Sequence, residues 1–181
     1  MRFVCVHAGA EVIPVEAFRD LEGLRRVVFQ GASLRALGAS AFRGTALEEF
    51  VAPVSLRKIG DGAFADCRNL RRAVLNEGLE RIGTQDTEMG IFQDSGLQEV
   101  VLPSTLRALG TRSFAGCIEL RRVSLPEGLR EIGAGCFQGA GIEEIMISTC
   151  VNAIRERTFA QCLNLVRVNF ALGSTLEEIG A

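Results

Sequence analysis

The sequence predicts a solenoid, a stack of about seven repeat units of 22–28 residues each. Three observations predict it. A phenylalanine recurs at nearly constant spacing, a short apolar pattern with the period of a β-strand follows it, and a second apolar pair then precedes a glycine. Self-similarity at such a period is typical of repeat proteins, in which each unit contacts its neighbours along the stack.

The recurring phenylalanine defines the frame of the repeat. Its successive separations are 24, 22, 28, 22, 23 and 22 residues. Seven of the eleven phenylalanines share this position: Phe18, Phe42, Phe64, Phe92, Phe114, Phe137 and Phe159. We therefore expect one array over residues 1–181, with units that begin near residues 13, 37, 59, 82, 109, 132 and 154. The seven rings should form one internal stack.

A strand is expected after each phenylalanine turn, in the pattern L-x-x-V-x-L. Its last two apolar residues are separated by one residue, which is the period of a strand with one buried face. Pro53, Pro103 and Pro126 follow three of these segments and end them, because proline cannot donate to a ladder. The expected strands are 4–6, 27–29, 50–52, 73–75, 100–102, 123–125, 145–147 and 168–170.

A second apolar pair, with a spacing of three residues, closes each unit. It recurs as Leu34/Leu37, Leu56/Ile59, Leu79/Ile82, Leu106/Leu109, Leu129/Ile132, Val151/Ile154 and Leu176/Ile179. Glycine follows it at Gly38, Gly60, Gly83, Gly110, Gly133 and Gly180, where we predict a corner with positive φ. Arg155 occupies this position once, so we expect a different corner there.

Both ends of the chain are expected to lie within a repeat. Val4 and Val6 fit the strand of an incomplete earlier unit, and the chain stops where an eighth phenylalanine turn would begin. The strands around Val4 and Val168 would then have open edges, which predicts end-to-end self-association.

Three segments carry a family resemblance: AFADCRNLRRAVL (63–75), IFQDSGLQEVVLP (91–103) and SFAGCIELRRVSLP (113–126). On these motifs the chain resembles the BspA-like leucine-rich repeat family over essentially all of its length. The resemblance implies a right-handed leucine-rich-repeat solenoid with a parallel sheet on its concave side and short helical or irregular turns on the other. It also implies adhesive, cell-surface or secreted recognition modules rather than catalysts.

Composition argues against several functions. Twenty Lys and Arg against 22 Asp and Glu give a net charge near −2, without the positive field that a nucleic-acid binder needs. No stretch approaches the roughly 20 apolar residues that cross a bilayer, so we expect no membrane insertion. The apolar run at residues 3–6 is too short for a secretion signal. The compartment stays open: cytoplasmic as the chain stands, surface or secreted if it belongs to a longer relative.

The reactive residues do not predict an active site. Cys67, Cys117 and Cys162 share one inward position of the repeat, and no C-x-x-C pair exists, so we expect structural thiols and no metal or cofactor. Cys5 and His7 lack an orienting acid. Glycine pairs such as Gly60/Gly62 lack the context of a phosphate loop. We therefore predict no enzyme.

Two columns of outward side chains are the candidate site. The position before the first inward strand residue alternates in sign, which predicts a ladder of ion pairs: Arg26, Glu49, Arg72, Glu99, Arg122, Glu144 and Arg167. The next outward position forms an apolar stripe that fades toward the C-terminus: Val28, Val51, Val74, Val101, Ser124, Met146 and Asn169. Two interpretations of these exposed valines stay open. They reflect only the preference of β-branched residues for strands, or they form the apolar centre of an interface with a polar rim.

The predicted function is noncatalytic recognition of a protein or peptide through the concave sheet. The partner-binding residues would be Val28, Val51, Val74, Val101, Met146, Glu49, Arg72 and Glu99. The alternative is a structural spacer or assembly segment of a longer repeat protein. Residues 84–90, an insertion in the fourth unit, are either a tolerated surface loop, which we favour, or part of a binding rim.

Overall fold

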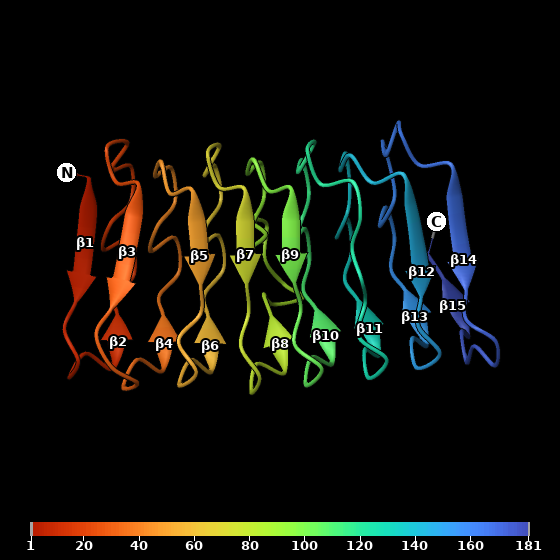
Figure 1. The fold of residues 1–181 in the computed structure, drawn as a ribbon. Helices are drawn as coiled ribbons and strands as arrows, with labels where there is room; N and C mark the ends of the chain where they lie inside the picture. The colour runs from red at the N-terminus through yellow and green to blue at the C-terminus, as the bar shows by residue number, and fades with distance from the viewer. Residues whose placement is uncertain (1, 181) are drawn as a thin grey trace.

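The computed structural model describes residues 2–180, so the first and last residues of the expected array lie outside the description. Over residues 2–180 the regular elements are fifteen short β-strands, stacked as a solenoid (Figure 1). That range contains no helix long and apolar enough to cross a membrane. No residue from 2 to 180 is assigned to a helix of any kind, so the turns are irregular, and the predicted solenoid is confirmed.

One row of strands follows the phenylalanine turns, and we call these the main strands. They pair in parallel and in register, so that Glu49, Arg72 and Glu99 are neighbours across three strands. Their bounds are β1 (Phe3–Val6), β3 (Arg26–Phe29), β5 (Glu49–Val51), β7 (Arg72–Val74), β9 (Glu99–Val101), β12 (Glu144–Ile147) and β14 (Arg167–Phe170). These strands overlap seven of the eight expected ones, and each begins one residue earlier than expected.

The expectation of a strand at 123–125 is wrong. The structure assigns no strand to residues 121–126, and the main strands fall into three separate sheets: β1–β3, β5–β7–β9 and β12–β14. The outward residue of this segment is Ser124, where the first four units carry valine. Loss of the β-branched side chain lowers the preference for extended, paired backbone, and Pro126 removes the next donor.

A second row of two-residue strands was not expected from the sequence. These strands contain the last residue of each second apolar pair, and in Figure 1 their arrows run opposite to those of the main strands. They are β2 (Val12–Ile13), β4 (Ala36–Leu37), β6 (Lys58–Ile59), β8 (Arg81–Ile82), β10 (Ala108–Leu109), β11 (Glu131–Ile132), β13 (Ala153–Ile154) and β15 (Glu178–Ile179). Two residues are too few to show a strand period.

The phenylalanine stack is confirmed. Neighbouring rings lie nearly parallel, with centroids 5.2–5.9 Å apart from Phe18 to Phe159. Phe92 takes its place in the stack despite the insertion that precedes it. The five inner rings are fully buried, whereas Phe18 and Phe159 at the two ends are half-buried. The stack is therefore the continuous core against which both rows of strands pack.

The corner glycines are needed for a reason other than the predicted one. Positive φ is found at Gly83 among them, but not at Gly38, Gly60, Gly110, Gly133 or Gly180. There, a Cβ atom would lie only 2.4–2.6 Å from the nearest backbone atom of the preceding unit. The prediction of positive φ is wrong at these five positions, because close approach of two backbones excludes the side chain.

Arg155 occupies the same corner position, which at this link accommodates a side chain. Its N–H donates to the Ile132 carbonyl at 3.3 Å. The equivalent bond is 2.7–2.9 Å at the five corner glycines without positive φ, for example 2.9 Å from Gly60 to Leu37. The corner at Arg155 is thus looser, in agreement with the expectation that this link differs. The left-handed residues of each unit lie instead two positions from the phenylalanine, as at Gly62 and Asp66 around Phe64.

Candidate protein-interaction surface

The outward side of the main strands, which we call the main-strand face, carries the predicted apolar stripe. Val51, Val74 and Val101 are register partners on β5, β7 and β9. Val51 and Val101 are 51% and 40% exposed, and Val74 is half-buried. The residues beside them on the strands, such as Phe50 and Ala73, are buried. Alternation along each strand therefore leaves contiguous valine surface over an otherwise apolar core.

The structure divides the predicted site residues into three groups. Six of them lie together on the β5–β7–β9 sheet: Glu49, Val51, Arg72, Val74, Glu99 and Val101. Val28 is 37% exposed on β3, in the adjoining sheet, and Met146 is 52% exposed on β12. The residues 121–126, which form no strand, separate Met146 from the valines. The six residues of the central sheet are thus the compact candidate surface.

Arg72 is the centre of the charged column. Its guanidinium lies 2.9 Å from the Glu49 carboxylate and 3.2 Å from that of Glu99. The hydrogen bond to Glu49 and the charge of Glu99 raise the pKa of Arg72. The predicted arrangement, with arginine between two glutamates, is therefore realised on this sheet. These three charges border the valines as a polar rim.

The ladder does not continue over the whole array. At the C-terminal end Arg167 lies 3.9 Å from Glu144. Within residues 2–180, Arg26 and Arg122 make no ion pair. Both arginines belong to units beside a break between sheets, where the register that brings partners together is lost.

A second charged column, one residue earlier in each unit, was missed by the sequence analysis. Arg25 lies 3.3 Å from Glu48, and Arg121 lies 3.9 Å from Glu143. The sequence does contain a pattern that indicates this column. Arginine doublets occur in odd units and glutamate doublets in even units, at 25–26, 48–49, 71–72, 121–122 and 143–144. The charge alternation therefore extends across two columns of the main-strand face.

We expect the Glu49–Arg72–Glu99 column to couple neighbouring units. Glu99→Arg should lower the thermal midpoint at low salt, because it places a second cation beside Arg72. Adding Arg72→Glu should restore part of the loss. A double-mutant cycle in low salt measures the coupling, which should shrink in high salt because the groups are exposed. Additive effects at both salt concentrations would contradict a contribution from the column.

The insertion at 84–90 is tied to its neighbours. The Thr84 hydroxyl donates to Asp61 at 2.9 Å in the preceding unit, and the Thr111 hydroxyl donates to the Gln85 carbonyl at 2.8 Å in the next. It follows β8 of the second row, rather than a main strand. These bonds on both sides favour the interpretation as an accommodated insertion.

The cysteines of the repeat are core residues. Cys67, Cys117 and Cys136 are buried, and the shared inward position has a specific contact. The Cys67 and Cys117 thiols donate to the carbonyls of Phe42 and Phe92 in the preceding unit, at 3.0 and 3.1 Å. Cys162 makes the same bond at 2.9 Å. The cysteine thus links the third, fifth and seventh units to the phenylalanine turn before each of them.

Burial makes these thiols unreactive. It raises the pKa of Cys67 to about 11 and that of Cys117 to about 12. We expect iodoacetamide at pH 8 to modify the exposed Cys5 and Cys150 of the folded chain and to spare Cys67 and Cys117. Mass spectrometry of peptide digests measures this, with a urea-unfolded sample as control. Equal labelling of all six in the folded chain would contradict it.

The same pKa shifts predict a pH dependence of stability. The folded state holds the Cys67 and Cys117 thiols neutral, whereas the ordinary pKa of an unfolded thiol is near 9.0. Their contribution is therefore fully present below about pH 9 and is lost between about pH 9 and pH 12.

The other candidate reactive pair has a structural arrangement. The His7 Nδ1 atom accepts a hydrogen bond from the Gly9 N–H at 3.1 Å in the turn after β1. Cys5 is exposed on β1. In the described residues no three His, Cys, Asp or Glu side chains lie close enough together to hold a metal ion.

Comparison with known families identifies the repeat. The family model described as BspA type leucine rich repeat region matches residues 4–86 and 85–181, in six copies. The chain belongs to this family. Leucine-rich repeat proteins of this fold are typically non-catalytic and act as interaction modules.

Solved structures show the same fold at low sequence identity. The chain is similar to a leucine-rich repeat protein of T. pallidum, with a TM-score of 0.63 and 23% identity over 98% of this chain and 72% of that one. The pneumococcal vaccine antigen PcpA matches with a TM-score of 0.56 and 19% identity, over 99% of this chain and 56% of its own.

A leucine-rich cell surface protein from Faecalibacterium prausnitzii also matches. Its TM-score is 0.51 and its identity 22%, over 94% of this chain and 60% of that protein. The chain therefore spans less than two thirds of that relative's length. No curated protein matches the chain. At these identities the likeness concerns the fold alone.

Proposed function

We propose that the chain is a noncatalytic recognition module that binds a protein or peptide through the main-strand face. The observation that supports this most is the register of Val51, Val74 and Val101 on one sheet, beside the Glu49–Arg72–Glu99 column. Contiguous apolar surface on a protein commonly marks an interaction site, and a charged border resembles the rim of an interface. Neighbours of the same fold include a cell surface protein and a vaccine antigen, which is compatible with recognition.

The charges of this surface are ordered before a partner arrives. Both carboxylates beside Arg72 hold its guanidinium in place, at 2.9 and 3.2 Å. A side chain that is already fixed loses less conformational entropy on binding, so more of the contact energy contributes to affinity. The valines supply the water-excluding centre, and the column determines which charges of the partner fit.

The test removes the apolar centre and leaves the fold intact. Peptides selected from a displayed random library on the wild-type chain serve as probes, and their affinity is measured by biolayer interferometry. We expect Val74→Asp with Val101→Asp to abolish binding while the thermal transition changes little, because both side chains point outward.

The matched control is Val15→Asp with Ile118→Asp. These residues are 64% and 63% exposed and lie in turns outside the main strands. This control should bind like the wild type. Undiminished affinity in the Val74/Val101 variant would contradict the proposal and direct attention to residues 84–90 or to the opposite side.

A second candidate function, an assembly or spacer segment, is favoured by the surface of the last unit. Val166, Leu163 and Leu172 there are 84%, 93% and 98% exposed. Such surface would be covered by another repeat unit, whether from the same polypeptide or from a second copy. Sedimentation velocity over a range of concentrations tests it. Association that Val166→Glu with Leu172→Glu removes would support this function, and a strict monomer would oppose it.

A further inference from the structure

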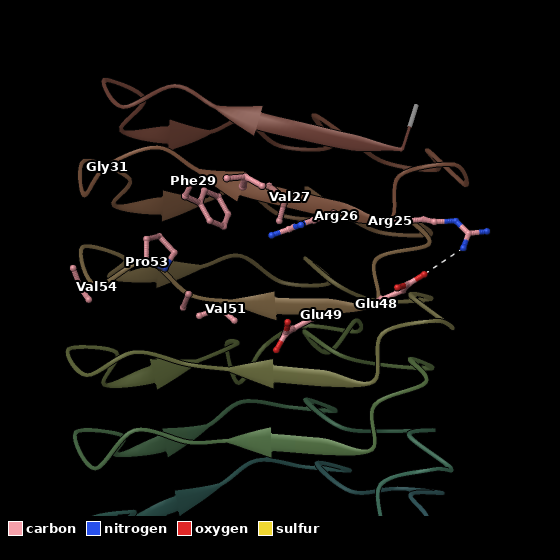
Figure 2. A pocket seen from close by; sticks show the side chains of 12 residues that line it. Arg25, Arg26, Val27, Phe29, Gly31, Glu48, Glu49, Val51, Pro53 and Val54 are labelled. Carbon is pink, nitrogen blue, oxygen red and sulfur yellow. Dashed lines mark hydrogen bonds and ion pairs between the residues drawn. The ribbon is translucent and has the colours of Figure 1, made fainter.

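The main sheet is interrupted between β3 and β5. β3 pairs with β1, and β5 pairs with β7, so the two strands belong to separate sheets. They are joined near their N-terminal ends, where the Glu48 N–H donates to the Arg25 carbonyl at 3.2 Å and the two side chains form an ion pair at 3.3 Å. Beyond this point a groove of about 750 Å³ lies between the strands (Figure 2).

Two aromatic side chains explain the interruption. Phe50 occupies an inward position that holds Ala73 in the next main strand, and it is fixed against Phe64 with ring centroids 4.4 Å apart. Phe29 meets it edge to face, with centroids 6.1 Å apart. A buried ring that is held from below cannot move inward, so the two rings keep the backbones of β3 and β5 apart.

The space between the two strands is too narrow for a third strand. The hydrogen bond from the Glu48 N–H to the Arg25 carbonyl holds β3 and β5 together at one end, and the Phe29 and Phe50 rings fill the interior below them. A third strand would need about 4.8 Å on either side. A ligand therefore contacts the groove from its outward side, through side chains.

The groove also contains an uncompensated positive charge. Figure 2 shows the Arg26 side chain extending from β3 over the groove, while the Glu49 carboxylate points away from β3. Glu49 is bound to Arg72 at 2.9 Å, and within residues 2–180 Arg26 has no acidic partner. Val28, two residues along the same strand, is exposed beside it and lines the same groove.

We propose that the groove between β3 and β5 binds an extended acidic segment of a partner protein. The segment lies along the outward opening of the groove, and an Asp or Glu side chain pairs with Arg26. An apolar side chain two residues further on packs against Val28, because residues i and i+2 share one face of a strand. The occupant is defined by the charge of Arg26 and by the apolar lining of the groove. This site rests on the proposed function in using the main-strand face, but it does not require Val74 or Val101.

The probe is a fluorescein-labelled peptide, Thr-Thr-Glu-Thr-Val-Thr-Thr, with binding followed by fluorescence anisotropy. We expect saturable binding that Arg26→Gln weakens about tenfold, a loss typical of a charge-assisted hydrogen bond at a partly dry site. Arg26→Glu should instead favour the peptide in which lysine replaces glutamate. Arg35→Gln is the matched control, since Arg35 is exposed just before β4 of the second row, and it should bind like the wild type.

A salt titration provides a second measurement, because a contact between the peptide carboxylate and Arg26 should weaken as the ionic strength rises. Equal affinity for wild type and Arg26→Gln, or no saturable binding up to about 1 mM peptide, would overturn the proposal. A dimer of the chain alone that Arg26→Gln dissociates would assign the groove to a second copy and would also overturn it. The Val74→Asp/Val101→Asp variant should retain peptide binding, so failure of the stripe and failure of the groove are distinguishable.

Discussion

Phe114→Ala is expected to lower the free energy of unfolding by about 3–5 kcal/mol, and Phe64→Ala by a similar amount. Both rings are fully buried and are stacked on a ring of the unit before and of the unit after. Truncation therefore leaves a cavity with rigid walls on two sides, which the neighbouring units cannot fill. Urea denaturation followed by far-UV circular dichroism measures the loss.

Phe3→Ala is the control for this prediction. Phe3 is 63% exposed on β1, outside the stack, so its truncation should change stability little. A loss below about 1 kcal/mol in both Phe64→Ala and Phe114→Ala would mean that the stack is not the principal core of the array. Phe64 should be the more sensitive of the two, because it also contacts Phe50, with ring centroids 4.4 Å apart.

The parts of the fold that were predictable are those that repeat. The spacing of the phenylalanines predicted the stack, and the alternation of inward residues predicted the seven main strands, together with an eighth at 123–125 that does not form. The periodicity is predictive because each unit packs against its neighbours through equivalent residues. The second row of strands escaped prediction, since a pair of residues such as Lys58–Ile59 forms its ladder only through stacking on the next unit.

The parts that were not predictable depend on what differs between units. Phe29 and Phe50 each fit the apolar frame, and only their meeting in adjacent layers separates β3 from β5. The sequence likewise predicts the charge column as a pattern. It does not predict that Glu49 pairs with Arg72 rather than with Arg26, because that depends on the separation of β3 from β5. A repeat frame predicts the average layer, whereas the candidate sites of this chain lie where layers deviate from it.

The second large expected effect concerns the corner glycines. Gly60→Ala should destabilise the chain by about 3 kcal/mol, the upper part of the usual range for overpacking. The new Cβ would lie 2.4 Å from the backbone nitrogen of Ala39, a contact that no side-chain rotation relieves. The two units would have to move apart there, which would weaken the hydrogen bond of 2.9 Å from the Gly60 N–H to the Leu37 carbonyl.

The comparison that decides this prediction is Gly60→Ala against Gly9→Ala, each measured by urea denaturation. A Cβ at Gly9 would meet only the His7 side chain, at 3.5 Å, and the φ of Gly9 is not positive. Gly9→Ala should therefore be neutral or slightly stabilising, because alanine restricts the unfolded chain. The same reduction of unfolded-state entropy acts at Gly60, so any net loss there measures the clash between backbones. If the two variants were equally stable, backbone contact between units could not be the reason for glycine at the corner, and the five corners without positive φ would need another explanation.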